Sequence, residues 1–329
     1  MGKPLAVIGQ TLGTPETYQL LEHDPGQPGP GEVRYAIYAA AVNFVDVLVA
    51  GGKYQVKPKV PFIPGAECAG LVESVGAGVT QFKPGDRVLT SGVGNAFCQV
   101  AVTAEKNLIA FPASMNFIEA ATFKVSYATS YHALVQRGQL QAGETVLVLG
   151  AAGGVGYAAI QIAKALGCRV IASASSADKR ELALQAGADA SIDARSESWR
   201  EDLKAANNGN AIDVVVDPVG GAATEPAFRS LAWKGRHLVI GFANGEIPRL
   251  PTNLALLKGA ALVGVDFRQF YTYEPDQAAA NMRELFRLQA AYGMRAHVGR
   301  IFPMAQFAEA MKLAASGTCL GRIVLKMRE

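Results

Sequence analysis

The sequence predicts an α/β protein in which a doubly wound parallel sheet accompanies a second, β-rich unit. Between about residues 145 and 265, near-continuous apolar segments of strand length alternate with segments of helical periodicity, which is typical of a parallel sheet. Before about residue 120, short alternating segments are broken by glycine and proline, which favours a compact, barrel-like β unit. At 329 residues the chain is also long for a single core, so two domains are expected.

The β-rich part contains a turn cluster at residues 26–31 and a second break at 58–64, both rich in glycine or proline. Three segments around these breaks predict strands: 33–37, 70–76 and 82–89. The C-terminal tail returns to mixed structure, with helices expected at 278–292 and 305–316 and a last strand at 322–326. We expect this last strand to rejoin the N-terminal unit.

The central part of the chain supplies the parallel sheet. Its strands are expected at 145–149, 169–173, 190–192, 212–217, 237–240 and 261–265. The intervening helices are expected at 157–166, 177–186, 197–206 and 223–231. One further helix, through Ala133 and Leu134, leads into the first strand.

The most informative segment runs from Thr145 to Gly156, where a strand leads into a glycine-rich turn and then into a helix. Only residues without bulky side chains let the backbone approach a pyrophosphate, and the helix N-terminus offers unpaired N–H groups and a partial positive charge. A glycine triplet alone is weak evidence, but the flanking strand and helix make it a good signal. A tight turn that holds no ligand is the alternative. The segment therefore predicts a dinucleotide site.

The end of the second strand predicts which dinucleotide. An NAD site usually has Asp or Glu there to bind the ribose 2′-hydroxyl, but the expected position falls at or near Ala174. The hydroxyls of Ser175 and Ser176 and the ammonium of Lys179 could instead bind a 2′-phosphate. One of these serines could also cap the next helix, with Asp178 completing a capping box, and the two roles are compatible. NADPH is therefore the expected cofactor.

Composition excludes several classes of partner. The net charge is +3, with acids and bases interspersed, so neither nucleic acid nor a membrane surface is expected as a partner. The four cysteines lie far apart, without a CxxC pair, which suits a reducing compartment. The N-terminus lacks the apolar core of a signal peptide, so a cytoplasmic location is expected.

Several further segments carry a family resemblance: Asn-Phe-Val-Asp at 43–46, Gly-Lys-Tyr at 52–54, Pro-Gly-Ala-Glu-Cys-Ala-Gly at 64–70, the segment 79–88 and Gly-Arg-Ile-Val-Leu at 321–325. With these motifs the whole chain resembles a medium-chain dehydrogenase/reductase of the zinc-free quinone oxidoreductase (zeta-crystallin-like) branch. The resemblance implies a GroES-like substrate domain formed by residues 1–122 and 268–329. It implies a Rossmann NADPH-binding domain at 123–267, with a cleft between the domains where nicotinamide meets substrate.

The resemblance also implies roles for individual residues. Two should lie near the nicotinamide and its ribose: Asn43 and Thr129. Three should hold the pyrophosphate: Gly153, Gly154 and Val155. Ser175 and Lys179 should bind the 2′-phosphate, and Asp217 should lie near the adenosine side. Four should line the nicotinamide end: Gly241, Phe242, Val265 and Phe267.

The same resemblance implies a site without metal. Zinc-dependent relatives carry a histidine where this chain has Ala66, and two other ligand positions fall at or beside Asn43 and near Val125, not on cysteine. Their cysteine-rich structural lobe is also missing, because Cys98 is the only cysteine between residues 89 and 112.

Without a Lewis acid, oxidation of a simple alcohol is difficult, whereas hydride from NADPH can add to a quinone or an enone if hydrogen-bond donors stabilise the developing oxyanion. Tyr54 is the first candidate for that donor, with packing as its alternative role, and Asn43 is expected to orient cofactor or substrate. An NADPH:quinone oxidoreductase is expected. The alternatives are a reductase of α,β-unsaturated carbonyls or 2-enoyl thioesters, and a non-catalytic NADPH-binding protein. The resemblance also implies a homodimer, joined through the edge strand at 259–267.

Overall fold

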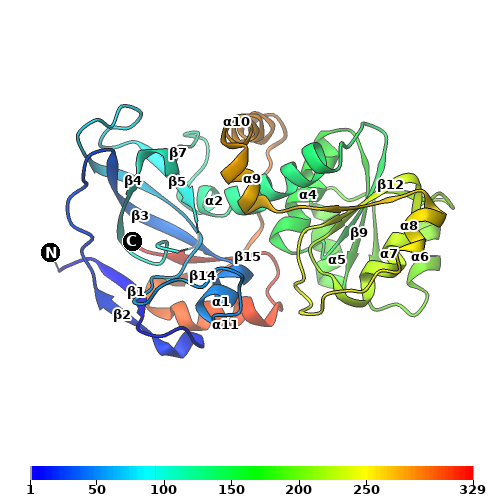
Figure 1. The fold of residues 1–329 in the computed structure, drawn as a ribbon, viewed down its shortest axis with the longest axis horizontal. Coiled ribbons are helices and arrows are strands. Elements are labelled where there is room, and N and C mark those ends of the chain that lie inside the picture. The colour runs from blue at the N-terminus through cyan, green and yellow to red at the C-terminus, as the bar shows by residue number, and fades with distance from the viewer. Residues whose placement is uncertain (1, 93, 329) are drawn as a thin grey trace. The chain divides into compact units, whose positions relative to one another are not determined.

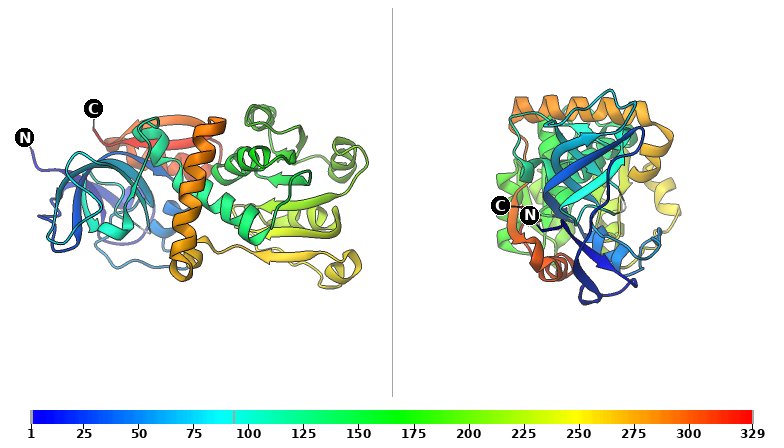
Figure 2. Two further views of the ribbon diagram at one scale, coloured as in Figure 1. Left: turned by 90° about the horizontal axis from the view of Figure 1, so that it is seen from above. Right: turned by 90° about the vertical axis from the view of Figure 1, so that its left-hand side faces the viewer.

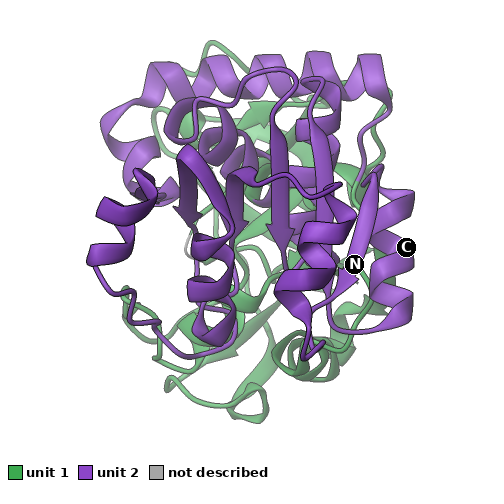
Figure 3. Ribbon diagram, turned by 90° about the vertical axis from the view of Figure 1, so that its right-hand side faces the viewer, with its two compact units in different colours: residues 1–125, 296–329 green, residues 126–295 purple. Residues whose placement is uncertain are grey.

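A computed structural model describes residues 2–92 and 94–328 of the chain. The chain divides into two compact units, which Figure 1 shows by chain order and Figure 3 by colour. Unit 1 comprises residues 1–125 and 296–329, and unit 2 comprises residues 126–295. Among the described residues, no helix combines the length and the apolar character needed to cross a bilayer.

Unit 1 is formed by both ends of the chain. Its strands are β1 (Leu5–Gly9), β2 (Tyr18–Glu22), β3 (Glu32–Val42), β4 (Glu67–Val75), β5 (Arg87–Ser91), β6 (Val100–Ala104), β7 (Ile109–Ala110), β14 (Val298–Pro303) and β15 (Arg322–Lys326). Its α-helices are α1 (Phe44–Ala50), α2 (Phe117–Ala121) and α11 (Phe307–Ser316). It also contains the short 3₁₀ turns η1 (Pro15–Thr17), η2 (Glu105–Asn107) and η6 (Met304–Gln306).

The large sheet of unit 1 has the order β14-β15-β3-β4-β5-β7, and β6 also pairs with β3. β15 runs antiparallel to β3, with Leu325 opposite Ala40. The expectation that residues 322–326 rejoin the N-terminal unit is therefore confirmed. The strands bury one apolar core with α11, whose residues Phe307, Ala310 and Met311 are buried in it.

Unit 2 is a doubly wound parallel sheet, as predicted. Its strands are β8 (Thr145–Leu149), β9 (Arg169–Ala174), β10 (Ala190–Asp193), β11 (Ile212–Asp217), β12 (Leu231–Val239) and β13 (Ala261–Gly264). They pair in the order β10-β9-β8-β11-β12-β13, and every pair is parallel. Helices flank this sheet on both sides (Figure 1). The buried strands β8 and β11 lie at the centre, which explains their continuous apolar sequences.

The helices of unit 2 are α3 (Thr129–Tyr131), α4 (Gly154–Ala165), α5 (Ala177–Gln185), α6 (Trp199–Ala206), α7 (Thr224–Arg229), α8 (Asn253–Lys258), α9 (Phe267–Tyr273) and α10 (Pro275–Tyr292), with the 3₁₀ turn η5 (Gly221–Ala223). Two segments are π-helical: η3 (Lys124–Ala128), which spans the boundary between the units, and η4 (His132–Arg137), which lies in unit 2. α10 is the long orange helix of Figure 2.

The second domain boundary differs from the one that the sequence predicted. Residues 268–295, which we expected in the substrate domain, belong to unit 2. His132 stacks on Phe270 with their ring centroids 3.9 Å apart. Gln136 and Asn281 exchange two hydrogen bonds of 2.9 Å each. These contacts tie α9 and α10 to the helical segment that precedes β8, so the dinucleotide-type domain extends to residue 295.

Candidate cofactor and active site

The turn after β8 has its shape because its residues lack side chains. Gly150 has a φ of 60°, in the left-handed region. A Cβ on Gly156 would lie 2.4 Å from the carbonyl oxygen of Gly150, so only glycine lets α4 begin this close to the strand. Gly153 is the N-cap of α4, and no described side chain caps that helix. The first-turn N–H groups, including those of Gly154 and Val155, therefore suit an anion, and a pyrophosphate fits this turn.

The end of β9 lies beside this turn. β8 and β9 are parallel neighbours, with Leu149 opposite Ser173, and the N–H of Ala151 donates to the carbonyl oxygen of Ser173 (3.3 Å). Ser175 follows the last residue of β9 and is partly exposed. One dinucleotide can therefore contact the glycine turn and the end of β9 at once.

Ser176 caps α5, because its Oγ accepts a hydrogen bond from the N–H of Lys179 (3.3 Å). The capping role is thus confirmed for Ser176, but the box expected with Asp178 does not form. Asp178 is the second residue of α5, whereas a capping box needs the third. Lys179 is partly exposed one turn into the helix.

The other predicted residues of unit 2 lie at the same edge of the sheet. Asp217 ends β11, Gly241 and Phe242 follow β12, and Val265 and Phe267 follow β13. The N–H of Val265 donates to the carbonyl oxygen of Val239 (3.0 Å), and the Phe242 side chain is 39% exposed. Ligands of open parallel sheets bind at the carboxyl ends of the strands, so this edge is the candidate cofactor site.

Asp217 has its hydrogen-bonding capacity filled from within unit 2. Its Oδ1 accepts from the N–H groups of Val219 (2.9 Å) and Gly220 (2.8 Å), and its Oδ2 accepts from Thr224 Oγ1 (2.7 Å) and contacts His237 Nε2 (2.9 Å). Burial opposes its ionisation, but the bonds from His237 and Gly220 bring its pKa below the usual value. Asp217 therefore shapes the backbone at the end of β11. A contact to adenosine remains a prediction.

Thr129 begins α3, and its neighbour Ser130 fastens that helix to α4 by donating to the carbonyl oxygen of Val155 (2.8 Å). Tyr127 and His132 lie close to Thr129 in the chain. Both are buried, and Tyr127 donates to Gln161 Oε1 (2.6 Å). They contribute to the packing of unit 2.

In unit 1, a buried polar cluster surrounds Asn43, the residue that precedes α1. Arg322 Nη2 donates to Asn43 Oδ1 (2.7 Å) and lies 3.2 Å from Glu67 Oε2. Glu67 Oε1 accepts from the N–H of Val125 (2.7 Å), and Asp46 Oδ2 accepts from the N–H of Asn43 (2.6 Å). Val125 is the second residue of the π-helical segment η3, where backbone N–H groups have no partner within the helix, so the Glu67 side chain satisfies this donor.

The charges of this cluster are strongly perturbed because they are removed from water. Burial raises the pKa of Glu67 to about 7, against the lowering effect of Arg322. Burial also raises the pKa of Asp46 to about 7 and lowers that of Lys124 to about 8. Glu67 is therefore a buried, hydrogen-bonded carboxyl, and Asp46 anchors the start of α1.

Arg322 is the member of this cluster to which sequence reasoning gave no role. It lies 279 positions from Asn43 in the chain, and only the pairing of β15 with β3, where Ile323 is opposite Val42, brings the two together. The resemblance pointed to the motif that contains Arg322 but gave the side chain no role.

Tyr54 follows α1 and is partly exposed, and its ring packs against the apolar core of unit 1. Among the described residues, no hydrogen bond joins the Tyr54 hydroxyl to Asn43, the other predicted catalytic side chain. The ring position is compatible with both packing and hydrogen-bond donation. A catalytic role for Tyr54 remains a prediction.

The side chains at the family's zinc positions do not fit a metal. Ala66 has no ligating atom, and Glu67 is already paired with the guanidinium of Arg322, which would repel a cation. Within residues 2–92 and 94–328, no group of three His, Cys, Asp or Glu side chains is placed to hold a metal ion.

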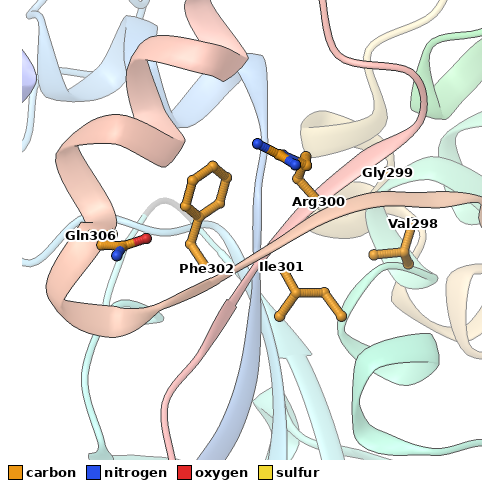
Figure 4. A pocket seen from close by; sticks show the side chains of 6 residues that line it. All are labelled: Val298, Gly299, Arg300, Ile301, Phe302 and Gln306. Carbon is orange, nitrogen blue, oxygen red and sulfur yellow. The ribbon is translucent and has the colours of Figure 1, made fainter.

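A shallow groove of unit 1 follows the edge strand β14 and contains none of the predicted site residues. Figure 4 shows Arg300, Phe302 and Gln306 on one side of this strand and Ile301 on the other. The groove is formed by an exposed strand edge, and nothing in it resembles a catalytic constellation.

Comparisons with known proteins agree with this geometry. Residues 29–155 match the model of the alcohol dehydrogenase GroES-like domain, and residues 154–284 match that of the zinc-binding dehydrogenase. Quinone oxidoreductase-like protein 2 of Rattus norvegicus is 34% identical over 324 residues, which cover 98% of this chain and 92% of that protein. A quinone oxidoreductase of Pseudomonas aeruginosa is 35% identical over 316 residues, covering 95% of this chain and 96% of that protein.

A solved mycobacterial protein in complex with NADPH has the same fold, with a TM-score of 0.89 and 28% identity over 98% of this chain and all of the other. A dinucleotide-type parallel sheet inserted into a GroES-like unit defines the medium-chain dehydrogenase/reductase superfamily, to which this chain belongs. Within it, the chain is a member of the zinc-free quinone oxidoreductase branch.

Proposed function

We propose that the protein is an NADPH-dependent oxidoreductase that transfers hydride to quinones without a metal. NADPH, when bound, supplies the hydride. The residues of the chain bind and orient it, exclude water and provide hydrogen-bond donors. One observation carries the proposal. The glycine turn before α4, which no described side chain caps, lies beside the end of β9, and β9 does not end in an acidic residue. The solved relative that binds NADPH supports it.

The preference for NADPH rests on the end of β9. An acidic side chain there would accept from a ribose hydroxyl and repel a 2′-phosphate, but this chain has Ala174. The hydroxyl of Ser175 and the ammonium of Lys179 provide the donors that a phosphate requires. Ser176 is already used as the helix cap, so we assign the 2′-phosphate to Ser175 and Lys179.

The preference for a conjugated acceptor rests on the groups near Asn43. A quinone needs hydrogen-bond donors for the oxyanion that develops as hydride arrives, and it needs no Lewis acid. The phenol of Tyr54 and the amide of Asn43 can both donate. We assign the oxyanion contact to Tyr54 and the orientation of the nicotinamide end to Asn43.

Steady-state assays test the proposal. The rate of NADPH consumption should be measured with benzoquinone, naphthoquinone, an alkenal and crotonyl thioester, and then repeated with NADH. We expect a quinone to give the highest kcat/KM, and NADPH to exceed NADH by about tenfold or more, as a charge-assisted phosphate contact implies. A clear preference for the thioester would identify an enoyl reductase. Binding of NADPH without turnover of any acceptor would identify a non-catalytic protein.

We also propose that the protein forms a homodimer through β13. Among the strands that the structure describes, β13 pairs only with β12, and its residue Leu262 is 50% exposed. Leu256 and Leu257 of the adjacent α8 are also exposed. An apolar sheet edge favours pairing with a second copy. Light scattering should give twice the mass of the chain, and Leu262→Lys should give the monomer mass; a monomeric wild-type protein would contradict this.

A further inference from the structure

A carboxylate lies one strand away from the end of β9, where an NAD site would carry its acidic residue. Strand β10 ends at Asp193, which is opposite Ala174 in the parallel pairing of the two strands. The N–H of Ala194 donates to the carbonyl oxygen of Ala174 (3.0 Å), and adjacent strands lie about 4.8 Å apart. The Asp193 side chain is 41% exposed. A negative charge is therefore present at the cofactor edge of unit 2, beside the end of β9.

The guanidinium of Arg180 balances this charge. Arg180 follows Lys179 in α5, and its Nη1 lies 2.8 Å from Asp193 Oδ2. The same Nη1 donates to the carbonyl oxygen of Ala174 (3.4 Å). One guanidinium, 25% exposed as a side chain, thus contacts the ends of both β9 and β10.

Asp193 is ionised at neutral pH. Its Oδ1 accepts a hydrogen bond from the backbone N–H of Arg195 (2.9 Å). This bond and the guanidinium of Arg180 hold the pKa of Asp193 below its usual value. A phosphate monoester carries a charge of about −1.5 to −2 near pH 7. An unbalanced Asp193 would therefore repel the 2′-phosphate of NADPH, whereas NADH has only hydroxyl groups on that ribose.

We propose that Arg180 determines the preference for NADPH over NADH, because it neutralises a carboxylate that would otherwise repel the 2′-phosphate. Arg180 acts through Asp193 and is not itself the ligand of the phosphate. The inference rests on the proposed assignment of the 2′-phosphate to Ser175 and Lys179. In this account, the end of β10 carries the acidic residue that the end of β9 lacks, and the choice of cofactor depends on whether its charge is balanced.

Charge compensation tests the proposal. Arg180→Met, Asp193→Asn and the double variant should be compared by their Kd for NADPH and for NADH, from fluorescence titration at low ionic strength. Arg180→Met should weaken NADPH about fivefold and NADH less than about twofold, as expected for charges at a solvent-exposed site. The double variant has the same net charge as the wild type, so its ratio of the two constants should return to within about twofold of the wild-type ratio. A double variant as weak for NADPH as Arg180→Met, or equal losses for NADPH and NADH, would overturn the proposal.

Two further measurements keep the test decisive. If Arg180→Met does not fold, Asp193→Asn alone is informative, since its amide oxygen retains an acceptor for the N–H of Arg195. It should tighten NADPH about fivefold and leave NADH unchanged, and an unchanged Kd for NADPH would overturn the proposal. The effect of either substitution should also shrink when the salt concentration is raised to about 1 M, because salt screens exposed charges. An effect independent of salt would point to a structural cause and contradict the proposal.

The matched control is Arg229→Met. Arg229 pairs with Glu225 (2.7 Å) at the end of α7, next to the start of β12 and so at the opposite edge of the sheet. Its loss should leave both constants unchanged. Lys179→Met separates failure of this inference from failure of the proposed function. If Lys179→Met leaves the ratio of the constants unchanged, the 2′-phosphate assignment itself is wrong; if it lowers the preference for NADPH and Arg180→Met does not, only this inference is wrong.

Discussion

Replacement of Glu67 by Gln should change how the stability of the protein depends on pH. Glu67 is completely buried, and burial raises its pKa from 4.5 to about 7. Three charged groups act on it: Arg322 and Lys124 lower its pKa, and Asp46 raises it. The native state therefore binds the proton of Glu67 more tightly than the unfolded state does.

The sign and size of the effect follow from that difference. The stability that this proton contributes is complete below pH 4.5, and it is lost as the pH rises toward 7. A rise of the Glu67 pKa from 4.5 to about 7 corresponds to about 3 kcal/mol. Glutamine does not titrate, so the free energy of unfolding of Glu67→Gln, minus that of the wild type, should increase by up to about 3 kcal/mol between pH 4.5 and 7 and stay constant above.

Urea denaturation at a series of pH values measures this difference directly. Asp46 and every other titrating group are present in both proteins, so their contributions cancel to first order. The control is Glu22→Gln, which makes the same carboxyl-to-amide change at the exposed end of β2, outside the cluster. The reasoning would be refuted if the free energies of unfolding of Glu67→Gln and the wild type differed by a constant amount from pH 4.5 to 7. Glu67 would then have the same pKa in the native and the unfolded state.

Three other substitutions test the remaining parts of the account. Gly156→Ala would place a Cβ 2.4 Å from the Gly150 oxygen, so the melting temperature should fall by an amount equivalent to about 1–3 kcal/mol and the NADPH Kd should rise; a neutral result would contradict the tight turn. Ser175→Asp should weaken NADPH about tenfold or more and NADH much less, and an equal loss for both would remove the 2′-phosphate assignment. Tyr54→Phe should lower kcat about tenfold or more without changing stability, and an unchanged rate would make Tyr54 a packing residue.

Much of unit 2 was predictable because its signals are local. The apolar segments at 145–149 and 212–217 correspond to β8 and β11, which are buried on both faces and so need no alternation. The strands of a parallel sheet all end at the same edge, so residues that follow them in the sequence can be placed at that edge. This prediction needs no information about contacts between distant parts of the chain.

The misses have physical causes. The helix predicted at 223–231 ends at Arg229, because Leu231 pairs with Ile212 and is the first residue of β12. Strand β12 is therefore longer than the apolar segment from which a strand was predicted. The short helix α1 was not predicted, since its seven residues are too few to show a helical period.

The cluster around Asn43 lies beyond sequence reasoning for a different reason. Glu67 and Arg322 become partners only through the pairing of β3 with β4 and with β15, which no local pattern reports. The boundary at residue 295 likewise depends on the packing of α10, whose amphipathic sequence does not say which unit it covers.

The central claim is that hydride passes from NADPH to a conjugated acceptor without help from a metal. Its most direct test measures NADPH consumption with naphthoquinone before and after exhaustive dialysis against a chelator, with the zinc content determined in both samples. The account predicts the same kcat in both samples and no correlation with zinc. Loss of activity on chelation, with recovery when zinc is added, would contradict it.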